Sequence, residues 1–362
     1  MEFQKMNFRE ELAKVSPKIR KGAEIYIWGT GNGWKQIRQR YKTIHNIKLE
    51  DFIYAFIDND PLKQHTGFYG KRIIAPAEID KENAVVMISL NDYPDRSVLR
   101  QLLRMGFQWR SDCFDNAYLE WMLWRYNRLQ FSRFKGKHDG ERCFIIGNGP
   151  SLRTHDLDRL KNEITFAVNH IFNVFDKTSW RPTYYVIEDT LFEIDSKTIC
   201  ENINGIKFIY APAALMFEGF EVENAYYYNS DTRIAHQQYP YTAEFSTEPG
   251  TVFWATTIVY TCLQLAALMG FKEIYLIGVD HNFPVRRKAN GEVIYSEAKA
   301  HFYKEQANVS FSYDTGTNID LLNSGYEAAR EYADNNGFKI YNATRGGKLE
   351  AFERVDFNNI VL

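Results

Sequence analysis

A short strand and its exit turn are encoded by Cys143-Phe144-Ile145-Ile146-Gly147-Asn148-Gly149-Pro150-Ser151-Leu152. Four apolar residues in a row are typical of a strand that is buried on both faces, and the glycines that follow end it. Apolar runs, polar turns and helical periodicity then alternate to the end of the chain. This alternation predicts a parallel, doubly wound sheet of the α/β class.

Further strands and helices of this half follow the same pattern. The expected strands are Thr165–Val168, Tyr184–Ile187, Lys207–Tyr210, Glu273–Ile277 and Lys339–Tyr341, with helices over Thr251–Met269 and Tyr326–Asn336 and a hairpin-like stretch at Tyr226–Asp231. The segment Pro249–Phe271 carries no charge and is long enough to span a bilayer. However, four polar residues recur in it at helical spacing, namely Thr256, Thr257, Thr261 and Gln264. We therefore expect a buried helix on the sheet and no transmembrane segment.

The first half of the chain contains a smaller unit of the same kind. A strand at Glu24–Trp28 runs into Gly29-Thr30-Gly31-Asn32-Gly33, and further strands are expected at Phe52–Ile57 and Ala84–Ser89, with a helix at Ser97–Met105. The expected organisation is two Rossmann-like domains joined by a helical linker. Its parts are an N-terminal helix over residues 1–21 (amphipathic over 1–20), a small domain over 22–115, the linker over 116–140 and a catalytic domain over 141–362.

Composition limits the classes of partner and the compartment. The chain has 362 residues, enough for two domains, and its 44 basic and 46 acidic residues give no electrostatic reason to expect nucleic-acid binding. The four cysteines show no C-x-x-C spacing, which predicts a reducing compartment and no structural zinc. The N-terminus lacks an apolar signal core. We expect a cytoplasmic protein, and a peripheral position at the inner face of the membrane stays open, as does an oligomer.

The candidate site follows from the predicted sheet, because open α/β sheets bind ligands at the carboxyl ends of their strands. Polar residues directly follow five strands of the second half, at Asn148, Ser151, Asn169, Glu188, Asp189, Asp280, His281, Asn342 and Thr344. The glycine turn at 147–151 would let a ligand approach the backbone, and Ser151 would cap the following helix, whose amides suit a phosphate. An ordinary strand-to-helix turn is the alternative, since the turn matches neither a P-loop nor G-x-G-x-x-G.

Other residues carry open alternatives. Asp280 would hold a metal, bind a ribose or cap a helix, and His281 and His301 are the histidines best placed as a general base. Gly250 and Thr251 start the expected uncharged helix and offer a second anion site. The loop over residues 283–299 contains Arg286, Arg287 and Lys288, and is either a lid that brings cations to a phosphate or a solvated loop. In the first domain, Asp58 lies where a ribose-binding acid would lie, but a structural or regulatory role is favoured there.

Residues 141–362 resemble a family of bacterial domains that groups motility accessory factors with the archaeal-type 6-hydroxymethylpterin diphosphokinases, and these resemble CMP-sialic acid-dependent sialyltransferases. The resemblance is carried by Ile145–Leu152, Ala167-Val168-Asn169, Gly250–Phe283 and Asn342-Ala343-Thr344. The first domain resembles a small module at the front of several sugar-modifying enzymes, through Ile25–Gly33, Phe56–Asp60 and Ile73–Pro76. Together these resemblances imply a glycosyltransferase-like second domain in surface glycan or glycoprotein synthesis.

The resemblance also assigns roles to residues. It implies donor or nucleotide contacts at Gly147, Asn148, Gly149, Pro150, Ser151, Asn169, Gly250, Thr251 and Gly278, with Asp280 near the ribose and His301 in the region of the histidine base. The acidic pair Glu188-Asp189 would contact the acceptor or a metal. It departs from the sialyltransferases, which have an amide there, and resembles the kinase-like relatives.

Three functions remain in competition. The favoured one is a glycosyltransferase that uses a nucleotide sugar, with a CMP-linked acid sugar preferred, and a glycan, lipid-linked glycan or protein as acceptor. The second is a diphosphokinase that transfers diphosphate from ATP to a pterin, with Mg²⁺ held by Glu188, Asp189 or Asp280. The third is a non-catalytic nucleotide-binding scaffold. Only the second requires a cofactor, Mg²⁺; for the first, metal dependence is open.

Overall fold

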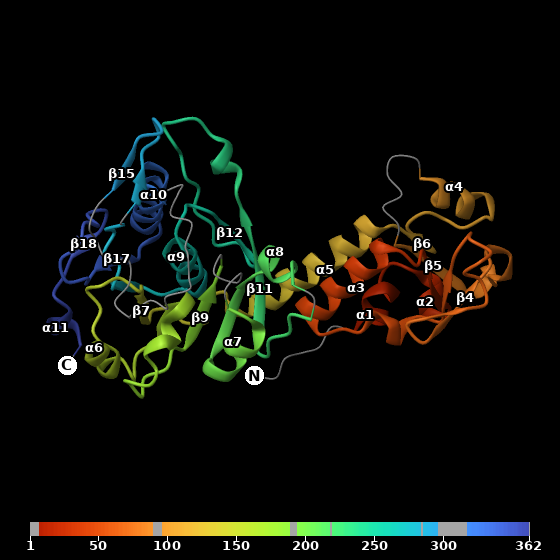
Figure 1. The fold of residues 1–362 in the computed structure, drawn as a ribbon, viewed down its shortest axis with the longest axis horizontal. Helices are drawn as coiled ribbons and strands as arrows, with labels where there is room; N and C mark the ends of the chain where they lie inside the picture. The colour runs from red at the N-terminus through yellow and green to blue at the C-terminus, as the bar shows by residue number, and fades with distance from the viewer. Residues whose placement is uncertain are drawn as a thin grey trace. The chain divides into compact units, whose positions relative to one another are not determined.

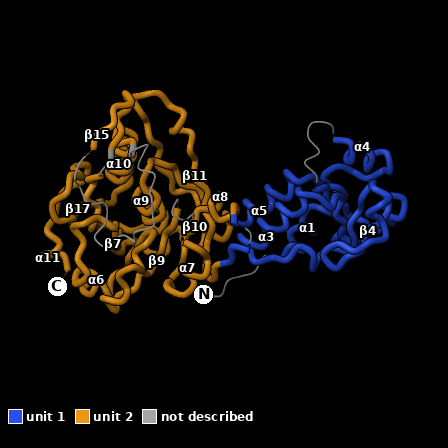
Figure 2. The backbone as a smooth tube through the Cα atoms, in the orientation of Figure 1, with its two compact units in different colours: residues 1–127, 217–221 blue, residues 128–216, 222–362 orange. Residues whose placement is uncertain are grey.

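The computed structural model describes residues 7–89, 96–188, 194–217, 219–283, 285–295 and 317–361. It divides into two compact units, residues 1–127 with 217–221 and residues 128–216 with 222–362 (Figure 2). The chain passes from the first unit to the second within helix α5 (Asn116–Phe131). This helix lies inside the segment expected to link two domains.

The first unit is built on a six-stranded sheet in the order β3-β4-β2-β1-β5-β6. All neighbours are parallel except the short pair β3 and β4. The helices α3 (Asn32–His45) and α4 (Ser97–Arg104) accompany a core that contains Trp28, Val86 and Leu102. The strands are β1 (Glu24–Trp28), β2 (Ala55–Ile57), β3 (Gly67–Phe68), β4 (Lys71–Ile74), β5 (Ala84–Ile88) and β6 (Cys113–Phe114).

Two expectations for this unit were wrong in detail. The described N-terminal residues form two short helices, α1 (Phe8–Ala13) and α2 (Pro17–Arg20), in place of one over residues 1–20. Proline favours the first position of a helix because it has no N–H to donate, so Pro17 starts a new helix. The expected strand from Phe52 begins only at Ala55, because Leu49–Phe52 forms the 3₁₀ helix η1.

The second unit contains a nine-stranded sheet in the order β12-β11-β10-β9-β8-β7-β13-β17-β18, and all of its neighbours are parallel (Figure 1). The strands that follow β7 in sequence extend to one side, and the chain then returns to place β13 on the other side. This reversal defines a doubly wound sheet and confirms the predicted α/β class. The strands are β7 (Arg142–Ile146), β8 (Thr165–Val168), β9 (Tyr184–Ile187), β10 (Ile206–Tyr210), β11 (Ala225–Asp231), β12 (Thr251–Phe253), β13 (Glu273–Ile277), β17 (Lys339–Asn342) and β18 (Glu353–Arg354).

The uncharged helix α9 (Ile258–Met269) packs within the core of this unit, with Tyr260, Leu263 and Ala266 buried. Its apolar composition therefore reflects burial. Within the described ranges, every helix is too short or too polar to cross a membrane. The other helices are α6 (Thr154–Arg159), α7 (Ser196–Asn202), α8 (Ala211–Ala214), α10 (Ile319–Asn336) and α11 (Phe357–Ile360).

The helix expected from Thr251 begins seven residues later. Thr251–Phe253 instead forms the edge strand β12, which pairs with β11. The buried Gln264 explains the difference, because its side chain accepts from the N–H of Phe253 (2.8 Å) and donates to the carbonyl of the same residue (2.9 Å). The Gln264 side-chain amide thus pairs with the backbone N–H and C=O of Phe253 in the edge strand. Thr257 caps α9 by accepting from the N–H of Val259.

Two other segments of this unit also differ from expectation. Residues 226–231, expected as a hairpin, belong to the parallel strand β11. The loop expected over residues 283–299 contains, in its described part, a hairpin of β14 (Val285–Arg287) and β15 (Val293–Tyr295), and β14 also pairs with β16 (Thr317–Asn318).

We predict a pH-dependent loss of stability that depends on His45. This side chain is 5% exposed, and burial lowers its pKa from 6.5 to about 4, although a hydrogen bond to the carbonyl of Leu123 opposes the shift. Between these values the unfolded chain binds the proton and the folded chain does not. Stability is therefore complete above pH 6.5 and falls by about 3 kcal/mol as the pH drops to 4.

The measurement is urea denaturation at several pH values for the wild type and for His45→Gln, which keeps a donor for Leu123. The variant should show a shallower loss of stability between pH 6.5 and 4. Equal slopes for the two proteins would contradict the assignment.

Candidate functional site

The centre of the candidate site is the point where the strand order of the second unit reverses. β7 and β13 are neighbours there, with Ile146 opposite Ile277. Ligands of doubly wound sheets bind outside the carboxyl ends of the strands at such a point. The loops that leave the two strands are in direct contact, because Gly147 N donates to Ile277 O (2.9 Å) and Gly149 N donates to Gly278 O (2.8 Å).

This contact accounts for the glycines. A Cβ atom on Gly147 would lie 2.5 Å from Gly278 O, and one on Gly278 would lie 2.6 Å from Gly147 O. Gly278 also has a φ of +63°, in the left-handed region. A Cβ atom on Gly149 would overlap the Asp280 carboxylate. The structure therefore explains these glycines by the approach of two protein backbones, where the sequence predicted the approach of a ligand.

Ser151 and Asp280 connect the two motifs across this contact. Ser151 Oγ donates to Asp280 Oδ2 (2.7 Å), and the N–H of Ser151 lies 3.3 Å from the same oxygen. Burial raises the pKa of Asp280, while the hydrogen bonds from Ser151 oppose this shift. The predicted helix cap at Ser151 was wrong, because α6 starts only at Thr154 and the Ser151 hydroxyl is used by Asp280.

Three residues of this unit combine backbone strain with an unused polar atom. Asn169, Thr256 and His281 have φ values of +47°, +54° and +52°. Each also buries a side-chain atom that has no partner among the described residues, namely Asn169 Oδ1, Thr256 Oγ1 and His281 Nδ1. Left-handed backbone costs about 1–2 kcal/mol for a residue with a Cβ atom, and an unpaired buried polar group costs about 1–3 kcal/mol. Such costs persist mainly where function requires the geometry.

The topology places these residues along one edge of the sheet. Asn148 follows β7, Asn169 follows the adjacent β8, and His281 follows β13 on the other side. Asn148 Nδ2 donates to Val168 O (3.0 Å), which fixes the amide and leaves its buried Oδ1 without a partner in the described chain. Asn282 Oδ1 is likewise buried without a partner in the described chain. This edge therefore contains several buried polar atoms that no described protein group uses.

The start of α9 lies at the same edge. Thr261, in the first turns of α9, donates to Glu188 Oε2 at the end of β9 (3.2 Å). Burial raises the pKa of Tyr326 on α10, and the nearby Thr257 side chain opposes this shift. The Tyr326 ring lies 5.8 Å, centroid to centroid, from the His281 ring. We include Thr256, the neighbour of Thr257, in the candidate site because it combines a left-handed backbone with a buried unpartnered hydroxyl, although the sequence indicated it only as part of a polar helical stripe.

His281 has the properties of a base. Burial lowers its pKa below 6.5, the charge of Arg286 lowers it further, and a hydrogen bond with Asn323 opposes both. The imidazole is therefore neutral at pH 7. With Nδ1 unprotonated, it has a lone pair to accept a proton from a bound hydroxyl group.

The structure separates several other predicted residues from this group. Gly250 and Thr251 lead into β12, the edge strand farthest from β13 on that side, and start no helix. Asn342 and Thr344 are used internally, since Asn342 donates to Leu349 O (2.8 Å) and Thr344 Oγ1 accepts from the N–H of Val279 (3.1 Å). Pro150 is exposed on the glycine turn. Asp189 and His301 lie outside the described residues.

A metal centre is not assembled from the described side chains. Nowhere in the described ranges do three His, Cys, Asp or Glu residues come together as ligands. Glu188 is 7% exposed and hydrogen-bonded to Thr261, and Asp280 to Ser151. The assignment of Glu188 and Asp189 to an acceptor or a metal stays a prediction.

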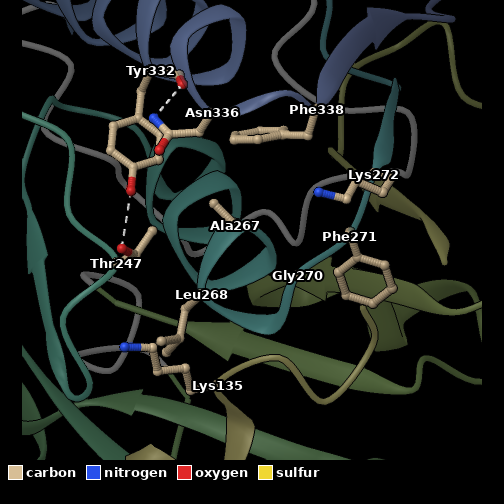
Figure 3. Close-up of a pocket in the computed structure, with 10 residues that line it drawn as sticks. All are labelled: Lys135, Thr247, Ala267, Leu268, Gly270, Phe271, Lys272, Tyr332, Asn336 and Phe338. Carbon is tan, nitrogen blue, oxygen red and sulfur yellow. Dashed lines mark hydrogen bonds between the residues drawn. The ribbon is translucent and has the colours of Figure 1, made fainter. Parts of the chain in front are cut away.

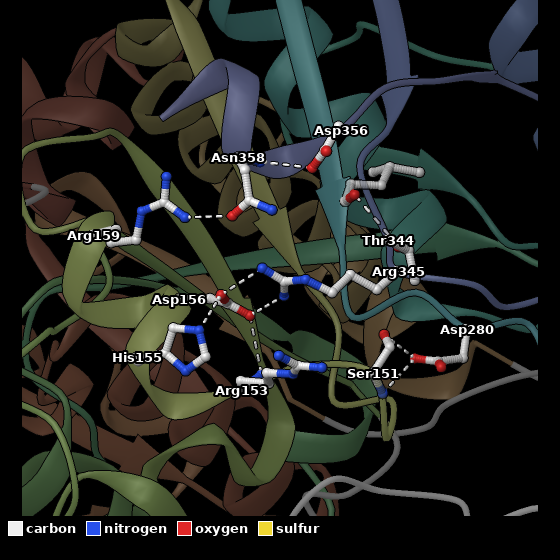
Figure 4. A network of polar contacts seen from close by, with 11 residues as sticks. Ser151, Arg153, His155, Asp156, Arg159, Asp280, Thr344, Arg345, Asp356 and Asn358 are labelled. Carbon is white, nitrogen blue, oxygen red and sulfur yellow. Dashed lines mark hydrogen bonds and ion pairs between the residues drawn. The ribbon is translucent and has the colours of Figure 1, made fainter. Parts of the chain in front are cut away.

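A polar network beside Ser151 and Asp280 holds α6 in place (Figure 4). The Asp156 carboxylate is 1% exposed and binds Arg345 through both oxygens, with Arg345 Nη2 2.9 Å from Oδ1. Asp156 Oδ2 also accepts from the N–H of Arg153 (3.2 Å), and Arg159 donates to Asn358 (2.9 Å). These contacts tie α6 to the loop after β17 and to α11, and they have a structural role.

One described cavity lies away from the candidate site, and Figure 3 shows the side chains that line it. It has a volume of about 170 Å³. Phe271 and Lys272 directly precede β13, and Phe338 directly precedes β17, so this cavity faces the amino ends of the strands. It is therefore distinct from the candidate site. Its lining consists of Lys135, Thr247, Ala267, Leu268, Gly270, Phe271, Lys272, Tyr332, Asn336 and Phe338.

In the first unit, the carboxylate of Asp58 is already engaged. It accepts from Thr30 Oγ1 (2.6 Å), the N–H of Asp60 (3.0 Å) and Lys63 Nζ (3.0 Å). Burial raises the pKa of Asp58, but these hydrogen bonds outweigh it and hold the pKa below its ordinary value. The geometry supports a structural role for Asp58.

Residues 123–286 match the model of the family described as 6-hydroxymethylpterin diphosphokinase MptE-like. The match confirms the resemblance to this family that the sequence motifs indicated. Among curated proteins, none matches the chain.

Two solved structures are distantly similar. The MAf glycosyltransferase from Magnetospirillum magneticum AMB-1 has 12% identity and a TM-score of 0.38, over 98% of this chain and 62% of that one. The chain thus spans less than two thirds of the length of this protein. The sialyltransferase CstII from Campylobacter jejuni, solved with the substrate analogue cytidine-5'-monophosphate, has 17% identity and a TM-score of 0.36, over 60% of this chain and 85% of that one.

We predict that Gly278→Ala destabilises the protein by about 2–4 kcal/mol, because it adds a clash with the backbone of Gly147 to the cost of left-handed φ. Gly346→Ala is the matched control. Its φ of +65° is nearly the same, and no atom lies within 4 Å of the added methyl group. The control should cost only about 1 kcal/mol. Chemical denaturation measures both, and equal losses would show that the contact between the two loops is not tight.

Proposed function

We propose that the second unit is a glycosyltransferase that uses a nucleotide-activated sugar, with a CMP-linked acid sugar as the favoured donor. The observation that carries the proposal is a group of strained residues with buried polar atoms that no described residue uses, namely Asn169 after β8, His281 after β13 and Thr256 just before α9. The match to the MptE-like family supports a transferase with a nucleotide substrate. We place the reaction in the cytoplasm, with a glycan, a lipid-linked glycan or a protein as acceptor.

The chemistry of these groups favours a sugar and a nucleoside as ligands. The unused atoms belong to amides, a hydroxyl and an imidazole, at Asn148, Asn169, Asn282, Thr256 and His281. Neutral donors and acceptors of this kind suit ribose hydroxyls, sugar hydroxyls and the edge of a base. A ligand that supplies the missing hydrogen bonds would recover the cost of leaving these atoms unpaired.

His281 is the proposed base. In the proposed step, His281 accepts the proton of an acceptor hydroxyl as its oxygen attacks the anomeric carbon of the donor. The bond from that carbon to the phosphate oxygen breaks with inversion, and the nucleotide leaves with the electron pair. Asp280, fixed by Ser151, would bind the ribose, and the glycine turn at 147–149 would lie beside it. His301 stays an alternative base.

A diphosphokinase is the second candidate, because the matching family is described by that activity. In this case ATP would occupy the same edge, and Mg²⁺ would be held by Glu188, Asp189 or Asp280. The pterin hydroxymethyl oxygen would attack the β-phosphorus, and AMP would leave.

A panel of CMP, CDP, UDP, GDP and ATP, each with and without Mg²⁺, distinguishes the candidates by thermal shift. A ligand at 100 times its Kd stabilises the folded protein by about 2.7 kcal/mol. A shift with CMP that needs no metal supports the transferase. A shift with ATP alone that requires Mg²⁺ rejects it in favour of the diphosphokinase. Binding without turnover of any CMP-sugar would leave the non-catalytic scaffold.

We predict that His281→Gln lowers kcat by about 10²–10⁴-fold while the donor still binds, because the base is lost and a polar side chain remains. In the wild type the acidic limb of the kcat profile should lie below pH 6.5, since burial lowers the pKa of His281. His65→Gln is the control, because His65 is exposed and lies in the first unit. Unchanged kcat in His281→Gln would move the role of base to His301.

A further inference from the structure

The hairpin of β14 and β15 directly follows the candidate site. Four residues of chain separate His281 from Arg286, the middle residue of β14. Arg286 is opposite Ile294 of β15 in an antiparallel pair and opposite Thr317 of β16 in a parallel pair. A β-strand with partners on both sides holds its backbone in a fixed register, so the position of Arg286 is defined by three strands.

A second connection fixes the hairpin to the helix that flanks His281. The N–H of Ala289 donates to Asp320 Oδ2 on α10 (2.7 Å), and β16 leads directly into α10. Tyr326 of the same helix lies against the His281 ring. The hairpin is therefore anchored to the site through the chain on one side and through α10 on the other.

The charges at this edge leave one role unfilled. Glu188 and Asp280 bring negative charge to this edge, and the neighbouring Asp156 is already paired with Arg345. A nucleotide donor would bring further negative charge in its phosphate. Among the cations of the hairpin, Lys288 is paired with Glu292 (2.9 Å). Arg286 and Arg287 form no ion pair with a described residue, and the Nε atom of each is buried without a partner in the described chain.

The two arginines are not equivalent. Successive residues of a strand project to opposite faces, so Arg286 and Arg287 point to different sides of the hairpin. Arg286 lies in β14, separated from His281 by only four residues of chain, and its charge contributes to the lowered pKa of His281. Arg286 is thus the arginine on the side of the candidate site.

We propose that Arg286 binds the phosphate of the nucleotide donor and stabilises the negative charge that develops on it when the glycosidic bond breaks. This inference rests on the proposed function. A guanidinium group has the planar donor geometry that matches two phosphate oxygens, and a preorganised cation is worth most where charge develops in the reaction. The hairpin is then a phosphate-binding arm, defined as residues 285–295, attached beside the base.

The test compares CMP with cytidine, which differ only by the phosphate, as ligands of the full-length protein in calorimetric titrations. Arg286→Gln should weaken CMP binding by at least about tenfold and leave cytidine binding within about twofold. Arg286→Lys keeps the charge and should recover part of the loss. Arg287→Gln, from the same strand, is the matched control and should leave both affinities within about twofold. Circular dichroism and the melting temperature establish that each variant is folded.

The outcomes separate this inference from the function on which it rests. Equal weakening of CMP and cytidine by Arg286→Gln would show that the arginine only supports the fold of the site, and an unchanged CMP affinity would reject it as a phosphate ligand; either overturns the inference alone. If the wild type binds ATP and not CMP, the donor class is wrong. The same comparison of ATP with adenosine then decides the role of Arg286. A wild type that binds no nucleotide overturns both.

Discussion

The contact between the loops after β7 and β13 is the constraint on which the candidate site depends. The two strands are central neighbours in the sheet. The turn after β7 donates two backbone hydrogen bonds to Ile277 and Gly278, and the approach is so close that it excludes a Cβ atom on Gly147 or Gly278. Because this approach brings Asp280 beside Ser151, the carboxylate is hydrogen-bonded before any ligand arrives. The glycine turn at 147–149 and Gly278 are therefore complementary parts of one contact. Each loop needs glycine because of the other loop's close approach.

The residues on either side of this contact are held at a free-energy cost. His281 directly follows Asp280 and has a left-handed backbone, and Asn169 has the same conformation after β8, on the other side of β7. A glycine at either position would adopt this conformation without strain, yet neither residue is glycine. The side chains of Asn169 and His281 each contain a buried polar atom without a partner in the described chain. This combination favours a ligand-binding role, because purely structural positions have no reason to keep both costs.

The sequence predicted the strands well because their signal is local. Thr165–Val168, Tyr184–Ile187 and Glu273–Ile277 are runs of buried residues with polar ends, and the structure has strands at the same limits. Asn148, Asn169 and His281 were found by the same rule, since polar residues that follow parallel strands meet at one edge. Thr256 was not found, because its place depends on where α9 begins. That start depends on Gln264, eleven residues from its partner Phe253, and such pairings leave no periodic signal in the sequence.

The late start of α9 has a consequence for the electrostatics of the site. A helix that began at Thr251 would have its positive end at the edge strand β12, far from β7 in the sheet order. Because Gln264 satisfies the backbone of Phe253, the chain leaves β12 and enters α9 within four residues, and Thr261 then reaches Glu188 at the end of β9. The partial positive charge at the start of a helix is thereby moved toward the centre of the carboxyl edge. It lies there beside the carboxylate of Glu188, and it partly offsets the repulsion that an anionic ligand would meet.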